Sequence, residues 1–169
     1  SDGFVLMVQD WGGPIGLSIA IDRPEQVRGL VILNTWAWPP SFSFRMFSYA
    51  VGGPVGKYLH LYRNFFAKTI VPNSIYYRKA KPPEVFKAYT DPFPTVESRM
   101  GTYIFPKAIR TNNAWMANID ANLHKLADKP SEFVWALKDQ AFARPEIVAA
   151  WKKHFPKGNW TELEKASHY

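Results

Sequence analysis

Residues 4–20, FVLMVQDWGGPIGLSIA, begin with an apolar run and end with a helix-forming segment. Phe4–Val8 is continuously apolar and too short for a helix, which is typical of a strand buried on both faces of a parallel sheet. Pro14–Ala20 carries a proline suited to a first helical turn, followed by apolar residues. Leu30–Leu33 is a second apolar run, so these segments predict a strand–helix–strand unit.

The C-terminal part repeats this pattern. Phe133–Leu137 predicts a strand, Pro145–Phe155 an amphipathic helix and Trp160–Lys165 a final strand. We therefore expect an α/β fold with a parallel sheet.

The middle of the chain has a different composition. It holds most of the prolines and aromatic residues and predicts helices in Pro- and Gly-rich loops, most clearly over Asn112–Asp128. We expect α/β core segments at 1–35 and 129–169, with a helical cap inserted at 36–128.

The formal charge of +7 over 169 residues suggests a nucleic-acid binder as one class to consider. Residues 45–110 hold 11 Lys+Arg against 3 Asp+Glu, which is +8, and the rest holds 10 against 11, which is −1. The basic residues are scattered through a Pro-rich segment without a binding motif. We therefore interpret the charge as a solvated surface and expect no nucleic-acid partner.

Other classes are excluded by what the sequence lacks. No run approaches the roughly 18 apolar residues of a membrane span, so we expect no membrane partner. The chain has no Cys, and its four His residues lack ligand-like spacing, so we expect neither a metal site nor an organic cofactor.

Three ionisable residues follow predicted strands, at the edge where sites form in an open α/β sheet: Asp10, Asp139 and His168. Asp10 lies between a strand and a helix, as in a nucleophile elbow with Asp in place of Ser, and the order nucleophile, acid, His is that of the hydrolases. A carboxylate is anionic at neutral pH and suits displacement at a saturated carbon, which leaves an ester on the enzyme. A His oriented by a second carboxylate can then activate water to cleave that ester.

Each of these residues also has a simpler interpretation. Asp10 and Asp139 fit turn or cap positions, and His168 fits a surface position. Trp11 has an indole N–H that suits a halide, although taken alone it fits core packing better. The hydrolase order of all three strand-end residues favours the joint, catalytic interpretation.

Residues 8–16, VQDWGGPIG, strongly resemble the nucleophile segment of haloalkane dehalogenases, which belong to the α/β-hydrolase superfamily. The resemblance covers nearly the whole chain in order. It continues through Arg23–Val27, Leu33–Pro39, Ala88–Pro94, Arg99, Phe105–Pro106, Leu137–Phe142 and Ala166–Tyr169.

The resemblance implies that Asp10 is the nucleophile, His168 the base that activates water and Asp139 the partner of His168. It implies that Trp11 binds the halide through its indole N–H and serves the oxyanion hole through its backbone N–H. Some members place the acid after the preceding strand, where this chain has Asn34. The segment with Phe105, Pro106 and Ile109 matches one that lines the family's apolar pocket, and ordinary cap packing explains Ile109 equally well.

The resemblance also implies a small haloalkane substrate, water as second reactant, a halide product and a cytoplasmic protein. It makes the chain a partial one, with sheet strands five to eight and the cap but without the first four strands, so its start says nothing about a signal. The family's second halide donor is either an Asn in a loop before this chain begins or a Trp in the cap.

Two alternative functions stay open. An epoxide hydrolase uses the same Asp–His–Asp logic with two cap tyrosines, and the cap holds seven tyrosines. A catalytically incompetent fragment is the other alternative.

Overall fold

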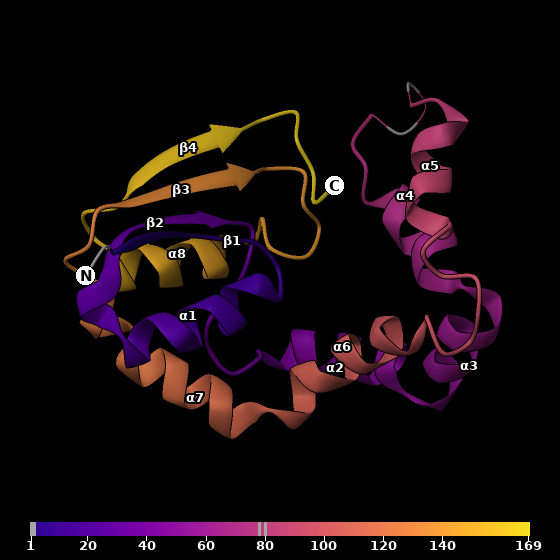
Figure 1. Cartoon of the computed structure of the whole chain (residues 1–169), viewed down its shortest axis with the longest axis horizontal. Helices are drawn as coiled ribbons and strands as arrows, with labels where there is room; N and C mark the ends of the chain where they lie inside the picture. Colours follow the sequence, from indigo (N-terminus) through magenta and orange to yellow (C-terminus); the bar gives the residue numbers. More distant parts are fainter. Residues whose placement is uncertain (1–2, 78, 80) are drawn as a thin grey trace. The chain divides into compact units, whose positions relative to one another are not determined.

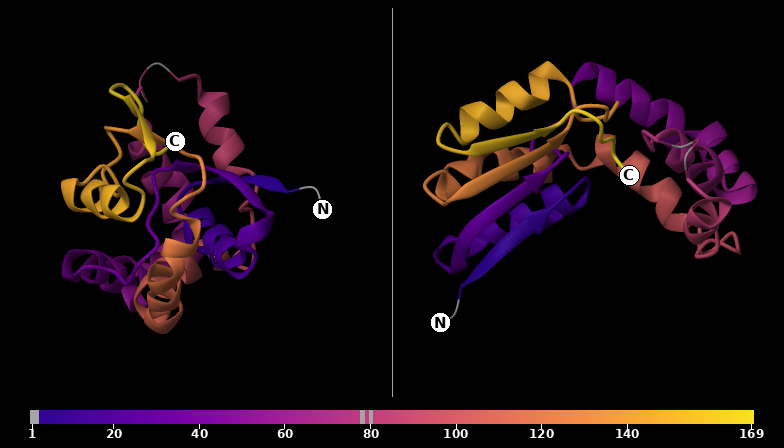
Figure 2. Two further views of the ribbon diagram at one scale, coloured as in Figure 1. Left: turned by 90° about the vertical axis from the view of Figure 1, so that its left-hand side faces the viewer. Right: turned by 90° about the horizontal axis from the view of Figure 1, so that it is seen from above.

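Four strands form a parallel sheet in the order β1-β2-β3-β4 (Figure 1). This computed structural model describes residues 3–77, 79 and 81–169. The strands are β1 (Phe4–Val8), β2 (Val27–Leu33), β3 (Ser131–Ala136) and β4 (Asn159–Leu163). The expected α/β fold with a parallel sheet is therefore confirmed, and Figure 2 shows the strands side by side in this order.

The chain divides into two compact units. The first runs through Pro39 and resumes over Ala114–His168, and it contains the sheet. The second comprises Pro40–Asn113 and Tyr169. The second unit is shorter than the predicted cap of 36–128, because the segment from Ala114 onward groups with the sheet.

Helices connect the strands of the first unit. Helix α1 (Gly12–Asp22) and the short 3-10 helix η1 (Pro24–Gln26) join β1 to β2, and α8 (Pro145–His154) joins β3 to β4. Right-handed crossovers in one direction along a sheet put their helices on one face, and Figure 1 shows α1 and α8 on the same side.

Aromatic side chains fill the core between α8 and the sheet. Phe133 on β3 lies 4.5 Å from the Trp160 ring and 5.6 Å from the Trp151 ring, measured between centroids. Phe133 and Trp151 are fully buried. This packing joins α8 to β3 and β4, and Asp139 follows β3.

Strand β1 differs from the sequence-based prediction. It was expected to be buried on both faces, but Val5 and Met7 are 63% and 67% exposed while Val8 is buried. Side chains alternate along a strand, so Val5 and Met7 point away from α1, which packs against Leu6 and Val8 on the other face.

The helix predicted over 112–128 is also divided. The structure has α7 (Asn113–Asn122) followed by the 3-10 helix η4 (Leu123–Leu126). A 3-10 turn places residues i and i+3 on the same side, and Leu123 and Leu126 are both fully buried.

The second unit is helical. Helices α2 (Phe42–Gly52) and α6 (Met100–Thr111) pack together, and the Arg110 guanidinium donates to the Ser48 carbonyl at 2.6 Å and to the Gly52 carbonyl at 3.0 Å. The other helices are α3 (Pro54–Arg63), the π-helix η2 (Phe66–Ile70), α4 (Val71–Asn73) and α5 (Pro83–Thr90).

Candidate active site

Asp10 occupies a sharp turn between β1 and α1. Its φ of 46° is in the left-handed region, where a non-glycine residue costs roughly 1–3 kcal/mol unless its surroundings hold it there. Its backbone N–H donates to the Asn34 carbonyl at 3.0 Å, and its own carbonyl accepts from the Gly13 N–H at 2.9 Å and from the Thr35 hydroxyl at 2.5 Å. These bonds at both ends of the residue hold Asp10 in the strained conformation.

The two glycines after the turn are not equivalent. A Cβ on Gly13 would meet the Thr35 Oγ1 at 1.9 Å, whereas a Cβ on Gly12 would meet no atom within 4 Å. The close packing of α1 against the segment after β2 therefore requires glycine at position 13 and not at position 12.

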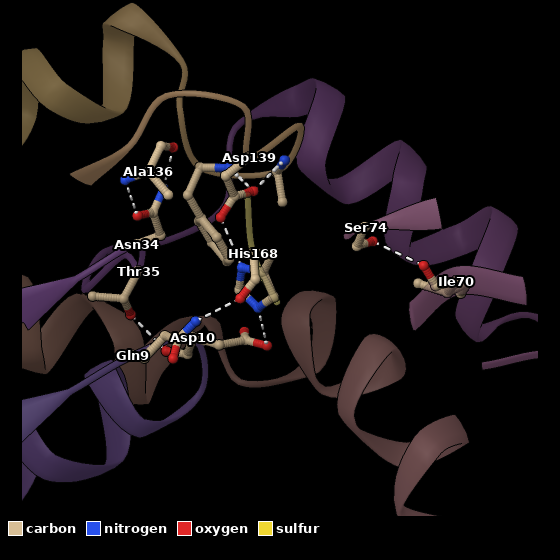
Figure 3. Close-up of polar contacts among 11 residues, drawn as sticks. Gln9, Asp10, Asn34, Thr35, Ile70, Ser74, Ala136, Asp139 and His168 are labelled. Carbon is tan, nitrogen blue, oxygen red and sulfur yellow. Dashed lines mark hydrogen bonds and ion pairs between the residues drawn. The ribbon is translucent and has the colours of Figure 1, made fainter. Parts of the chain in front are cut away.

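The structure brings the three predicted catalytic residues together (Figure 3). His168 Nε2 lies 3.2 Å from Asp10 Oδ2, and His168 Nδ1 lies 2.7 Å from Asp139 Oδ2. The Asp139 side chain is 1% exposed and the Asp10 side chain 39%. The Asp139 carboxylate at Nδ1 is thus buried, and the Asp10 carboxylate at Nε2 is accessible to solvent.

Backbone groups orient Asp139. Its Oδ1 accepts from the N–H groups of Ala141 at 2.8 Å and Phe142 at 3.1 Å, which leaves Oδ2 for His168. These local bonds to its own turn hold the Asp139 carboxylate beside the His168 imidazole.

Two opposing effects act on the proton of His168. Burial lowers its pKa, but hydrogen bonds to Asp10 and Asp139 and the charges of both carboxylates outweigh burial and raise the pKa from 6.5 to about 9. The raised pKa favours the protonated imidazole at neutral pH.

Aromatic rings connect Trp11 to the histidine. The Trp11 ring meets Trp36 edge-on at 5.0 Å between centroids, Trp36 stacks on Phe142 at 5.4 Å, and Phe142 lies 5.5 Å from the His168 ring. Trp11 directly precedes α1, so its side chain lies at the N-terminal end of that helix. These rings give the site an apolar wall.

Known proteins share this sequence and fold. Haloalkane dehalogenase 2 from Mycobacterium tuberculosis is 32% identical over 170 residues, which are 99% of this chain and 59% of that protein. The crystal structure of haloalkane dehalogenase DbeA from Bradyrhizobium elkani matches with a TM-score of 0.85 and 25% identity, over 99% of this chain and 61% of that one. Haloalkane dehalogenases are homologues of this chain.

The four-stranded sheet corresponds to the C-terminal half of the α/β-hydrolase fold of the haloalkane dehalogenases, as the sequence predicts. The chain spans about 59% of the length of the curated mycobacterial haloalkane dehalogenases to which it is similar. It is also similar to a cis-3-alkyl-4-alkyloxetan-2-one decarboxylase from Shewanella oneidensis, at 29% identity over 99% of this chain and 55% of that protein. No protein-family model matches the chain.

The predicted pocket residues lie on α6, in the second unit. Phe105 is exposed, whereas Pro106 and Ile109 are buried. The Pro106 carbonyl accepts from the Ser48 hydroxyl of α2 at 2.5 Å. The assignment of these residues to a haloalkane pocket stays a prediction.

Three residues beside the triad were not assigned a role from the sequence. Gln9 donates from Nε2 to the His168 carbonyl at 2.8 Å, and Asn34 and Thr35 contact the turns that carry Asp10 and Asp139. Their positions in the sequence could have pointed to them, because Gln9 adjoins Asp10 and the other two residues follow the strand beside it.

Within 3–77, 79 and 81–169, no group of three or more His, Cys, Asp or Glu side chains could hold a metal ion. No helix in the same ranges is long and apolar enough to cross a membrane.

Proposed function

We propose that this chain carries the catalytic residues of a haloalkane dehalogenase-like hydrolase, which converts a small haloalkane and water into an alcohol, a halide ion and a proton. The observation that carries this proposal is the placement of His168, with Nε2 3.2 Å from Asp10 Oδ2 and Nδ1 2.7 Å from Asp139 Oδ2. A nucleophile, a base and an orienting acid within hydrogen-bond reach form a hydrolytic triad.

The first step uses Asp10 as a nucleophile. One carboxylate oxygen attacks the carbon that bears the halogen, so a C–O bond forms while the C–halogen bond breaks and its electron pair leaves with the halide. Asp10 is accessible and anionic, and therefore this displacement requires no base. Trp11, at the N-terminal end of α1, is the proposed halide donor through its indole N–H.

The second step requires a neutral His168, and esterification of Asp10 provides it. The ester removes the Asp10 charge and weakens one of the hydrogen bonds that raise the pKa of His168, so the pKa falls and the proton is lost to water. The neutral Nε2 can then accept a proton from the attacking water, while Asp139 stabilises the imidazolium that results.

Hydrolysis of the ester restores the enzyme. Water oxygen bonds to the Asp10 carboxyl carbon, and the bond from that carbon to the alkyl oxygen breaks. The alkyl oxygen takes a proton from the His168 imidazolium and leaves as the alcohol. The carboxyl group returns its own proton to His168, so Asp10 is a carboxylate again. The backbone N–H groups at the start of α1 and the helix dipole stabilise the oxyanion that forms on the way.

Halide release from 1-bromobutane and 1,2-dibromoethane tests the proposal. We expect no more than weak halide release by the 169-residue chain, and none by Asp10→Ala. Asp120→Asn is a matched control, because Asp120 pairs with His154 at 3.0 Å in a His–Asp contact outside the triad. Absence of halide release by the parent would favour the catalytically incompetent fragment.

The position of water attack can be tested separately. Repeated turnover in oxygen-18 water should place the label in the Asp10 carboxylate, because water attacks the ester carbonyl carbon. His168→Gln should stop after the first step, leaving the alkyl group on the peptide that contains Asp10. Label found only in the alcohol, with none in that peptide, would contradict a nucleophilic Asp10.

Two other reactions belong in the same assay. An epoxide substrate tests the epoxide hydrolase alternative, which the same Asp–His–Asp geometry permits. The similarity to the Shewanella decarboxylase favours a second candidate, cleavage of an oxetan-2-one ring to carbon dioxide and an alkene. Turnover of one of these substrates without halide release from either haloalkane would replace the dehalogenase proposal.

A further inference from the structure

Asn34 and Thr35 lie at the C-terminal end of β2, between the turns that carry Asp10 and Asp139. Asn34 is 3% exposed and Thr35 fully buried, so their polar groups need partners inside the protein. The partners are backbone groups of both turns (Figure 3).

The Asn34 side chain contacts the β3 side. Its Nδ2 donates to the Ala136 carbonyl at 3.0 Å, and its Oδ1 accepts from the Ala136 N–H at 2.7 Å. Ladder pairing between the two strands ends at Leu33 and Val134, so the amide extends the pairing beyond the last backbone pair. The Ala136 carbonyl also accepts from the Asp139 N–H at 3.3 Å, which joins the Asn34 amide to the turn of the acid.

The backbone of Asn34 and the side chain of Thr35 contact the other turn. The Asn34 carbonyl accepts from the Asp10 N–H, and the Thr35 hydroxyl lies 2.5 Å from the Asp10 carbonyl against 3.4 Å from the Trp36 carbonyl. The Asp10 carbonyl is therefore the better acceptor for the single hydroxyl proton of Thr35. The Thr35 carbonyl in turn accepts from the Trp151 indole at 3.0 Å, which anchors the residue to α8.

We propose that Asn34 and Thr35 are a pair of positioning residues that hold the strained turn of the nucleophile and the turn of the acid at a fixed separation. His168 bridges the two carboxylates, so movement of either turn lengthens one of its two hydrogen bonds. The kinetic part of this inference rests on the proposed dehalogenase function, whereas the geometric part does not.

The amide at position 34 has a specific role in this arrangement. It acts as donor and acceptor toward the same residue, and only an amide supplies both at the observed distances. Both polar groups of the Asn34 side chain are therefore bonded to the Ala136 backbone, at the position where some homologues are expected to carry the acid.

Thr35→Val is the first test, because it keeps the shape of the side chain and removes only the hydroxyl donor. We expect kcat for halide release to fall by roughly 10²-fold with little change in KM, as a displacement of about 1 Å does in other enzymes. We also expect the pH midpoint of the His168 ring, measured by NMR, to move down from the parent value because its bond to Asp10 lengthens.

The controls separate positioning from general destabilisation. Thr35→Ser keeps the hydroxyl and should restore both readouts. Thr161→Val removes a comparable hydroxyl, which donates to Glu132 Oε1 at 2.7 Å on the exposed part of the sheet, and should change neither. Asn34→Leu is the second test, used if Thr35→Val does not fold. It adds no charge, and it should lower the His168 midpoint because it removes the bonds that hold the turn of Asp139.

The NMR midpoint is independent of turnover, so a parent chain without halide release would count against the proposed function and leave the positioning inference testable. A folded Thr35→Val or Asn34→Leu protein with an unchanged His168 midpoint would overturn the inference. So would a Thr35→Ser protein that behaves like Thr35→Val.

Discussion

At the scale of single residues, His168 depends on two carboxylates of different character. Asp139 is buried and fixed by backbone donors, whereas Asp10 is accessible and becomes an ester in the proposed reaction. The raised pKa of His168 links this arrangement to stability, because the folded protein holds the proton more tightly than the unfolded chain.

The stabilisation from His168 should depend on pH with a defined sign. It is fully present below the unfolded pKa of 6.5 and is lost as pH rises through the folded pKa of about 9. We expect the difference in unfolding free energy between the parent and His168→Gln, measured in urea, to shrink between about pH 6 and about pH 10. A difference that is constant or grows over this range would contradict the protonated triad.

The glycine pair after Asp10 allows a matched test of the nucleophile turn. Gly13→Ala places a Cβ against the Thr35 side chain, and we expect a loss of stability above about 2 kcal/mol in chemical denaturation. Gly12→Ala meets open space at the start of α1 and should change stability by no more than about 1 kcal/mol, because Ala favours helix over Gly. Equal effects of the two substitutions would show that Thr35 does not limit the space behind the turn.

At the scale of secondary-structure elements, α3 contains a buried histidine, His60. It is fully buried, neither of its ring nitrogens has a hydrogen-bond partner among the residues that the structure describes, and burial lowers its pKa. The Phe65 and Phe66 rings both lie 6.2 Å from its ring, between centroids, in the second unit. The neutral imidazole is therefore the form compatible with the fold.

Acid should destabilise the protein through His60. As pH falls below 6.5 the unfolded chain takes up a proton that the buried imidazole resists, so stability falls by up to about 1.4 kcal/mol per pH unit. His60→Leu should reduce the loss between about pH 7 and about pH 5, measured by urea unfolding. His124→Gln is the control: His124 is exposed, so this variant should lose as much stability as the parent between these pH values. An equal acid response in the parent and His60→Leu would contradict this prediction.

The elements also show what sequence patterns predict. Apolar runs located β1, β2 and β3, and β4 overlaps the strand predicted after the α8 segment, although residues 160–165 are not an apolar run. The turn after β1 and the hydrolase order located Asp10, Asp139 and His168, which the structure brings together. Exposure of Val5 and Met7 differed from the prediction, because a continuously apolar strand does not show which of its two faces a helix covers. The contacts of Asn34 and Thr35 were not predictable, since they depend on strand register, and those to Ala136 and Trp151 join segments more than 100 residues apart.

At the scale of the whole molecule, the three proposed catalytic residues all lie in the first unit. The second unit has its own polar framework, in which the Arg99 guanidinium donates to the carbonyls of Leu61, Phe93 and Pro94, each at 2.9 Å. Residues 40–113 also hold the excess positive charge, with 11 Lys+Arg against 3 Asp+Glu. Stability of the cap-like unit and geometry of the triad therefore rest on different residues.

Arg99→Ala should weaken the second unit without changing the triad. Loss of three charge-assisted hydrogen bonds should cost about 2 kcal/mol or more and speed amide hydrogen exchange in α3 and α6. The NMR midpoint of His168 should stay at the parent value, because its two carboxylate partners belong to the first unit. Asp139→Asn is the positive control, since it removes one of those carboxylates and should lower the midpoint. If the His168 midpoint fell as far in Arg99→Ala as in Asp139→Asn, the geometry of the triad would depend on the second unit.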